Sequence, residues 1–175
     1  LSAQQCFSLK EGETLDLSIE LPKVSADEML LDLKLDEPNL LKALALPKEG
    51  IGLAVFAQGG HEPTEHTLEE LAMVWDGLQK LDHLTIYHDV GQGKQDLLQS
   101  SRFKNLQEKG EVEVQALDFA TYFEALGRHL FVEAGTLPLI FLYERVEGEV
   151  IVRMSTAGYQ VGLGEQILQV LDHLK

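Results

Sequence analysis

The densest group of side chains that could exchange protons or bind a ligand lies in residues 61–66, whose sequence is HEPTEH. Two imidazoles and two carboxylates within six residues are groups that a metal site or an acid–base pair would use. The spacing differs from H-E-x-x-H, whose histidines share one helical face, and Pro63 should break a helix here. We therefore expect no metal and favour a structural role, in which Glu65 and Thr67 satisfy N–H groups of the following helix. The alternative is ligand binding by His61, Glu62, Glu65 and His66.

Three other places carry weaker chemical signals. His88 and Asp89 end an apolar run and could act as an acid–base pair, although polar residues at strand ends are more often simply solvated. The following GQGK, which ends at Lys94, is similar to a phosphate loop but lacks the full G-x-x-x-x-G-K-[ST] pattern. Tyr159 lies in a glycine-rich stretch, and we expect it either to protrude into a cleft or to pack over the edge of a sheet.

Composition excludes several classes of function. With Cys6 as the one cysteine, the chain has no cysteine pair for an internal disulfide, a zinc site or dithiol chemistry. A formal charge of −15 repels phosphate backbones, so we expect no nucleic-acid partner. No run approaches the roughly 18 apolar residues of a membrane helix, so we expect no membrane insertion. Because the chain begins at Leu1, we expect it to be processed or to be a piece of a longer protein.

The elements that would position these residues alternate between strand and helix from Ile51 onward. Residues 52–57 form a continuous apolar run of the kind that a doubly covered parallel strand shows. A polar loop over 58–66 then leads to a helix with Thr67 as its N-cap. That helix has a buried stripe of Leu68, Leu71, Ala72, Trp75 and Leu78. A strand over 84–90 follows, and then a helix that stops at Gly110 and has Leu97, Leu98, Phe103 and Leu106 inward. The next elements are a strand of Val112, Val114 and Ala116 and a helix over 118–133. Two antiparallel strands over 139–143 and 149–154 come after these, before a final helix marked by Ile167, Leu168, Leu171 and Leu174.

Residues 1–47 read differently from the rest. Leucine and isoleucine alternate with polar residues over 15–21 and over 31–35, which predicts two half-buried strands. A capping box from Ser25 to Glu28 is the alternative, because it would open a helix instead of the second strand. Asn39 is the expected cap of a short helix, and residues 47–50 look like a boundary. The sequence therefore predicts an N-terminal β extension over 1–47 and a main domain over 51–175.

The element order of the main domain, β-α-β-α-β-α-β-β-α, resembles the thioredoxin fold. The hairpin that closes it begins at Leu137-Pro138, where such domains carry their cis-proline. The resemblance implies a three-layer α/β fold with right-handed crossovers. Redox-active members place C-x-x-C between the second strand and its helix, where the helix N-terminus depresses one thiol pKa. Counted from Ile51, that stretch is residues 89–94, which contain no cysteine, so we expect no thiol–disulfide oxidoreductase activity.

Two short stretches suggest a narrower family. EPTEH over 62–66, and LPL over 137–139 followed by STAGYQVG over 155–162, are similar to the C-terminal region of large bacterial transglutaminase-like proteins, mainly of Firmicutes. In that family a papain-like Cys-His-Asp domain lies upstream of the thioredoxin-like region. The resemblance implies that this chain is an accessory region without the catalytic domain.

The predicted topology brings the candidate residues to one edge of the sheet, where ligands of open α/β sheets sit. The predicted binding set is His61, Glu62, Glu65, His66, Asp89, Lys94, Pro138 and Tyr159. We favour a non-catalytic module that needs no cofactor and binds a peptide or a neighbouring domain at the proline edge. The alternatives are a structural spacer and a hydrolytic or acid–base enzyme that uses the His/Glu/Tyr cluster. The sequence leaves open whether the protein is cytoplasmic or at a bacterial cell surface.

Overall fold

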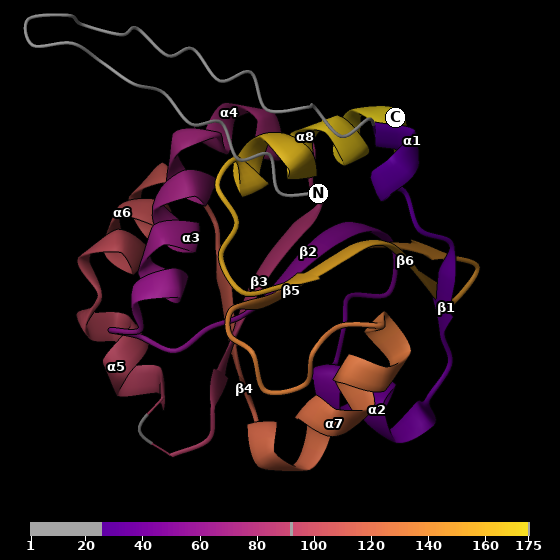
Figure 1. Ribbon diagram of the computed structural model, residues 1–175, viewed down its shortest axis with the longest axis horizontal. Helices are drawn as coiled ribbons and strands as arrows, with labels where there is room; N and C mark the ends of the chain where they lie inside the picture. Colours follow the sequence, from indigo (N-terminus) through magenta and orange to yellow (C-terminus); the bar gives the residue numbers. More distant parts are fainter. Residues whose placement is uncertain (1–25, 92, 175) are drawn as a thin grey trace, which may run out of the picture.

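The computed structural model describes residues 26–91 and 93–174, and its centre is a six-stranded sheet in the order β1-β6-β5-β2-β3-β4 (Figure 1). Strands β2, β3 and β4 are parallel, β5 is antiparallel to β2 and β6, and β1 is antiparallel to β6. The strands are β1 (Leu33–Leu35), β2 (Gly50–Phe56), β3 (His83–Asp89), β4 (Glu113–Leu117), β5 (Leu139–Val146) and β6 (Glu149–Ala157).

Helices cover both faces of this sheet, because successive residues of the buried strands point to opposite sides. Leu53 and Val55 face a side covered by α3, α6 and α8, which we call the aliphatic face. Ala54 and Phe56 face a side covered by α2 and α7, which we call the aromatic face. The helices are α1 (Ala26–Met29), α2 (Pro38–Leu44), α3 (Glu62–Met73), α4 (Trp75–Leu78), α5 (Gly93–Gln99), α6 (Ser101–Lys109), α7 (Phe119–Leu130) and α8 (Leu163–Leu174).

The predicted fold class is confirmed. From β2 onward the chain follows the thioredoxin-like order of elements, with helices in layers above and below the sheet. The Leu137-Pro138 bond is cis, as the resemblance predicted. Helix α7 begins as the sequence indicated, since Asp118 caps it by accepting a hydrogen bond from the Thr121 N–H at 3.1 Å. None of the helices in the described part of the chain is long and apolar enough to cross a membrane.

The N-terminal region differs from its predicted form. Before β1 the chain forms the short helix α1, near the place where the capping box would open one, and β1 has only three residues. Asn39 does not cap the next helix; Glu37 does, because its carboxylate accepts hydrogen bonds from the first backbone N–H groups of α2. The predicted strand over 15–21 and Cys6 lie outside the described residues. The division of the chain at residues 47–51 stays a prediction.

The helix after β2 begins six residues earlier than predicted. Helix α3 starts at Glu62, with His61 as its N-cap, so Pro63 lies in the first turn instead of breaking the helix. A proline is tolerated there because the N–H groups of the first turn have no partner within the helix. Thr67, the predicted cap, is buried in the middle of α3. Trp75 lies beyond the end of α3, in α4, where it packs against the core.

Two further helix and strand predictions need correction. The predicted helix ending at Gly110 is two helices, α5 and α6, because Ser100 interrupts the first and caps the second. Leu98 is consequently exposed instead of inward. In β4, at one edge of the sheet, Ala116 is exposed and Leu117 is the buried residue.

Candidate functional site

The start of β5 lies against the end of β2, so Pro138 and the connection after β2 share one edge of the sheet. Phe56 pairs with Leu139 of β5 and with Tyr87 of β3, and Leu139 pairs on its other side with Ala157. Beyond these pairs, the Gly158 N–H donates to the Pro138 carbonyl at 2.8 Å. We call residues 57–61, 136–138 and 158–162 the Pro138 edge.

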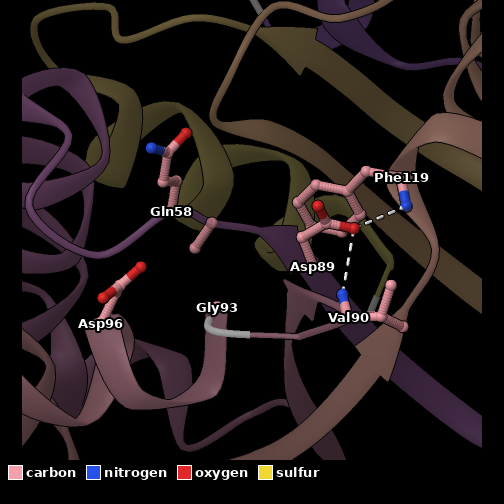
Figure 2. Close-up of a pocket in the computed structure, with 7 residues that line it drawn as sticks. Gln58, Asp89, Val90, Gly93, Asp96 and Phe119 are labelled. Atoms are coloured by element: carbon pink, nitrogen blue, oxygen red, sulfur yellow. Dashed lines mark hydrogen bonds between the residues drawn. The ribbon is translucent and has the colours of Figure 1, made fainter.

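A cavity of about 250 Å³ lies beside this edge, at the ends of β2 and β3 (Figure 2). One oxygen of Asp89, Oδ1, accepts hydrogen bonds from the Val90 and Phe119 N–H groups, each at 3.0 Å. Asp89 is therefore fixed by the backbone N–H groups of the residue after β3 and of the first residue of α7. Figure 2 shows Asp96 of α5 on the other side of Gly93 from Asp89, which gives the cavity an acidic character. Its lining residues are Ala57, Gln58, Asp89, Val90, Gly93, Asp96 and Phe119.

Glu65 holds the connection between β2 and α3 in place. Its Oε1 accepts from the Gly60 N–H at 2.9 Å, and its Oε2 accepts from the Ser100 hydroxyl at 2.7 Å. The predicted structural role of Glu65 therefore takes a different form, because its partners are a loop amide and the cap of α6 instead of N–H groups of its own helix. Glu65, Asp96 and Ser100 also line a second cavity, of about 470 Å³.

Thr67, predicted as a helix cap, and His88, favoured as a solvated residue, are both buried. The hydroxyl of Thr67 has no hydrogen-bond partner in the described part of the chain, so it satisfies no helix N–H. His88 is buried, and its Nδ1 lies 2.7 Å from the backbone carbonyl of Asp89, whose carboxylate bonds elsewhere. His88 and Asp89 therefore form no acid–base pair. His61 Nδ1 lies 3.3 Å from the hydroxyl of Thr64, which also accepts from the Gln58 N–H.

Tyr159 packs against helix α3, which differs from both predicted placements, a cleft and the edge of the sheet. Its hydroxyl donates to Glu70 Oε1 at 2.9 Å, and its ring centroid lies 5.3 Å from that of His66. The hydrogen bond to Glu70 is the main cause that raises the pKa of Tyr159. His66 Nε2 lies 3.7 Å from a carboxylate oxygen of Glu62, one helical turn earlier. Sequence reasoning did not identify Glu70, because its partner Tyr159 is 89 residues away along the chain.

The predicted binding residues thus fall into separate groups along the edge. Glu62, His66 and Tyr159 form one group on the outer part of α3. His61 and Glu65 belong to the connection before α3, and Asp89 lines the first cavity. Pro138 is buried at the start of β5, and Lys94 is exposed on α5. The part of the GQGK turn at Gln92 lies outside the described residues, and residues 26–91 and 93–174 contain no cluster of three acidic, histidine or cysteine side chains able to hold a metal.

The stretch comparable to a redox motif also changes position. Because β1 belongs to the sheet, the second strand is β2, and the comparable stretch is the connection 57–61 with the first turn of α3, instead of residues 89–94. His61 is the N-cap of α3 and Thr64 its third residue, the same separation as in C-x-x-C. Neither stretch contains a cysteine.

Comparison with known proteins gives distant similarities only. No protein-family model and no curated protein matches the chain. Among solved structures, StoA from Bacillus subtilis is 18% identical, with a TM-score of 0.46 over 72% of this chain and 85% of that one. Reduced Prx3 from Vibrio vulnificus is 20% identical, with a TM-score of 0.49 over 83% of this chain and 96% of that one. Identities this low say nothing about a shared function.

Proposed function

We propose that this chain is a non-catalytic thioredoxin-like binding module that holds an extended peptide, or an extended segment of a partner domain, at the Pro138 edge. The observation that carries the proposal is the backbone of Leu137. Within the described residues, neither its N–H nor its carbonyl has a hydrogen-bond partner. Its neighbours are paired, since the Thr136 N–H donates to the Glu133 carbonyl and the Pro138 carbonyl accepts from Gly158.

An unpaired donor and acceptor next to a buried strand can pair with an incoming chain. Buried backbone groups are almost always hydrogen-bonded, and Leu137 is only half exposed. An extended peptide can satisfy both groups of Leu137 at once, because the N–H and carbonyl of one residue in a strand point to the same side. Peptide recognition by strand addition uses main-chain hydrogen bonds for affinity and neighbouring pockets for side-chain selection.

The surroundings of Leu137 favour a basic peptide. The first cavity adjoins the end of β2, which is the neighbour of β5, and its polar lining includes Asp89 and Asp96. The chain as a whole has a formal charge of −15. Lysine or arginine side chains next to the paired residues would therefore be attracted, and acidic ones repelled.

The enzyme alternative has less support from the geometry. His61 contacts the hydroxyl of Thr64, but Thr64 is fully buried and is closed to a substrate. His66 contacts Glu62 and Tyr159, and neither of these is a nucleophile with an adjacent base. Membership of a larger transglutaminase-like protein stays a prediction, as does the spacer alternative.

The proposal can be tested by NMR titration with three octapeptides that alternate valine with lysine, threonine or glutamate. We expect the valine–lysine peptide to shift the amide signals of residues 57–61, Thr136 and Leu137, and to slow hydrogen exchange at the Leu137 amide. The valine–glutamate peptide should have the weakest effect. The Val146 amide at the opposite end of β5 serves as an internal control. If none of the peptides moves these signals at about 1 mM, the weak end of useful affinity, the proposal is wrong and the spacer alternative stands.

A further inference from the structure

The connection between β6 and α8 is fastened to helix α3 by a single carboxylate, that of Glu70. Oε1 accepts from the Tyr159 hydroxyl at 2.9 Å and from the Gly162 N–H at 3.1 Å. Oε2 accepts from the Gly164 N–H at 2.9 Å. Hydrogen bonds to a charged acceptor are stronger than those between neutral groups, so three of them make this the main polar link between α3 and the connection.

Capping of α8 explains only part of this arrangement. The first N–H groups of a helix lack partners within the helix, and the Gly164 N–H, in the first turn of α8, is one of these. Gly162 is the N-cap of α8, because its carbonyl accepts from the Gln166 N–H, so its bond to Glu70 also belongs to the cap. Tyr159 precedes the cap, so its bond to Glu70 satisfies no orphan group of the helix. The ring of His66, one turn before Glu70 on α3, packs on the same tyrosine. Two side chains of α3 therefore hold Tyr159, which a helix cap alone would not require.

The segment that Glu70 binds is itself part of the Pro138 edge and contacts Pro138. Gly158 and Gly162 have φ of +77° and +81°, a conformation that other residues adopt at a cost, and they bracket residues 159–161, of which Glu70 binds Tyr159. The Gly158 N–H donates to the Pro138 carbonyl at 2.8 Å. A Cβ on Gly158 would lie 3.4 Å from the Thr136 side chain, so the segment passes close to both sides of Leu137.

We propose that Glu70 is a positioning residue for the peptide site. By holding Tyr159 and Gly162 it fixes Gly158, and through Gly158 it fixes the carbonyl of Pro138, so that the backbone of Leu137 is presented in one orientation. The inference rests on the proposed function. It predicts that the hydrogen bond between Tyr159 and Glu70, and not only the cap of α8, governs the affinity for an extended peptide.

The test compares Glu70→Ala, Glu70→Gln and Tyr159→Phe with Glu69→Ala as the matched control. Glu69 is the preceding residue of α3, and its carboxylate lies 3.6 Å from Arg102, away from the Pro138 edge. Tyr159→Phe removes one hydrogen bond and leaves the Gly162 and Gly164 bonds in place. Two quantities are measured: hydrogen exchange of the Gly158 amide without peptide, and the Kd of the valine–lysine octapeptide.

We expect Glu70→Ala to speed Gly158 exchange and to raise the Kd, each by about tenfold or more, because charged hydrogen bonds are lost. Tyr159→Phe should change both quantities in the same direction by about threefold, because it removes only one of the three hydrogen bonds to Glu70. Glu70→Gln should recover much of the Glu70→Ala loss, since its amide oxygen can still accept. Glu69→Ala should leave both quantities unchanged.

Several results would overturn the inference. If Tyr159→Phe matches the wild type while Glu70→Ala speeds exchange throughout α8, Glu70 is only the cap of that helix. If Glu70→Ala speeds exchange at Gly158 and at Ile86 in the centre of the sheet alike, it only lowers global stability. If Glu70→Ala binds the peptide as tightly as the wild type, the positioning role of Glu70 is refuted, but the peptide site is not. A wild type that binds none of the three octapeptides refutes the peptide site, and the positioning role with it.

Discussion

The two faces of the sheet are held together in different ways. On the aromatic face, the Phe56 ring stacks on Tyr87 with centroids 4.7 Å apart and lies 5.9 Å from Phe123 and from Phe141. The aliphatic face contains mostly branched side chains, and its helix α3 carries Glu65 and Glu70, which bind connections at the Pro138 edge. The difference indicates that the rings supply stability, while the carboxylates of α3 supply the geometry of the candidate site.

Substitutions in β2 should give the largest effect and test this comparison directly. Phe56 and Leu53 are both buried in the same strand but face opposite sides. We expect Phe56→Ala to lower the free energy of unfolding by about 4 kcal/mol and Leu53→Ala by about 3 kcal/mol, because Phe56 also loses its ring contacts. Urea unfolding measures both. An equal or larger loss in Leu53→Ala would contradict the special role of the rings.

Alkaline unfolding should sharpen the comparison, because the aromatic face buries two tyrosines. Burial raises the pKa of Tyr87 and of Tyr143 far above the ordinary value of 10.0. Below about pH 10 both tyrosines are protonated in the folded and the unfolded chain, and their contribution to stability is fully present. Above about pH 10 this contribution is lost progressively, because the unfolded chain releases both protons and the folded chain does not. The loss should approach about 1.4 kcal/mol per pH unit for each tyrosine.

The measurement is urea unfolding between pH 7 and about 11, with Tyr143→Phe as the control. The Tyr143 hydroxyl has no hydrogen-bond partner within the described residues, so its removal should cost little at pH 7 and should make the alkaline decline shallower. An alkaline decline in Tyr143→Phe as steep as in the wild type would show that this tyrosine does not contribute.

On the aliphatic face, Ser100→Ala should give a smaller loss of stability and a clear local change. The Ser100 hydroxyl accepts from the Phe103 N–H at 3.0 Å and donates to Glu65, so the substitution removes a helix cap and releases Glu65. We expect a loss of about 1 kcal/mol in urea unfolding and shifted amide signals for Gly60. Ser101→Ala, at the exposed next residue, is the control and should do neither. Unmoved Gly60 signals in Ser100→Ala would argue against positioning by Glu65.

The smallest expected effect is a gain of stability at the end of α7. Phe131 is 80% exposed and has φ of +55°, which glycine adopts more readily than a residue with a Cβ. Phe131→Gly should therefore raise the free energy of unfolding by about 0.5 to 1 kcal/mol in urea unfolding. Phe131→Ala keeps the Cβ and should show no gain. A loss in both variants would mean that the Phe131 ring, despite its exposure, contributes to the aromatic face.

Much of the fold was predictable because its signals are local. The apolar run of β2, the cap of α7 at Asp118 and the proline before β5 each specify an element within a few residues. The predicted start of α3 was wrong, because the sequence alone does not distinguish a proline in the first turn of a helix from a proline that ends one. The break at Ser100 was missed because apolar spacing continues through it.

The candidate site was less predictable, because its contacts join distant parts of the chain. The edge of the sheet and the residues near it followed from the order of the strands. The side-chain contacts did not follow from the strand order, because the partners are far apart along the chain. Tyr159 and Glu70 are separated by 89 residues, and Ser100 and Glu65 by 35. An acid–base pair of His88 and Asp89 was considered beside the favoured interpretation that both are solvated, but two backbone N–H groups occupy the Asp89 carboxylate. Hydrogen bonds of this kind leave no periodic pattern in a sequence.

The short strand β1 has a consequence for the behaviour of the molecule in solution. It lies along the outer side of β6, where Leu33 pairs with Val152 and the Leu31 N–H donates to the Arg153 carbonyl. Arg153 also donates to Asp32 across this border and to Glu144 of the neighbouring strand β5. A bare strand as long as β6 would offer its backbone to other copies and invite edge-to-edge aggregation. Three paired residues and a charged border thus keep one edge of the sheet from becoming a template for self-association.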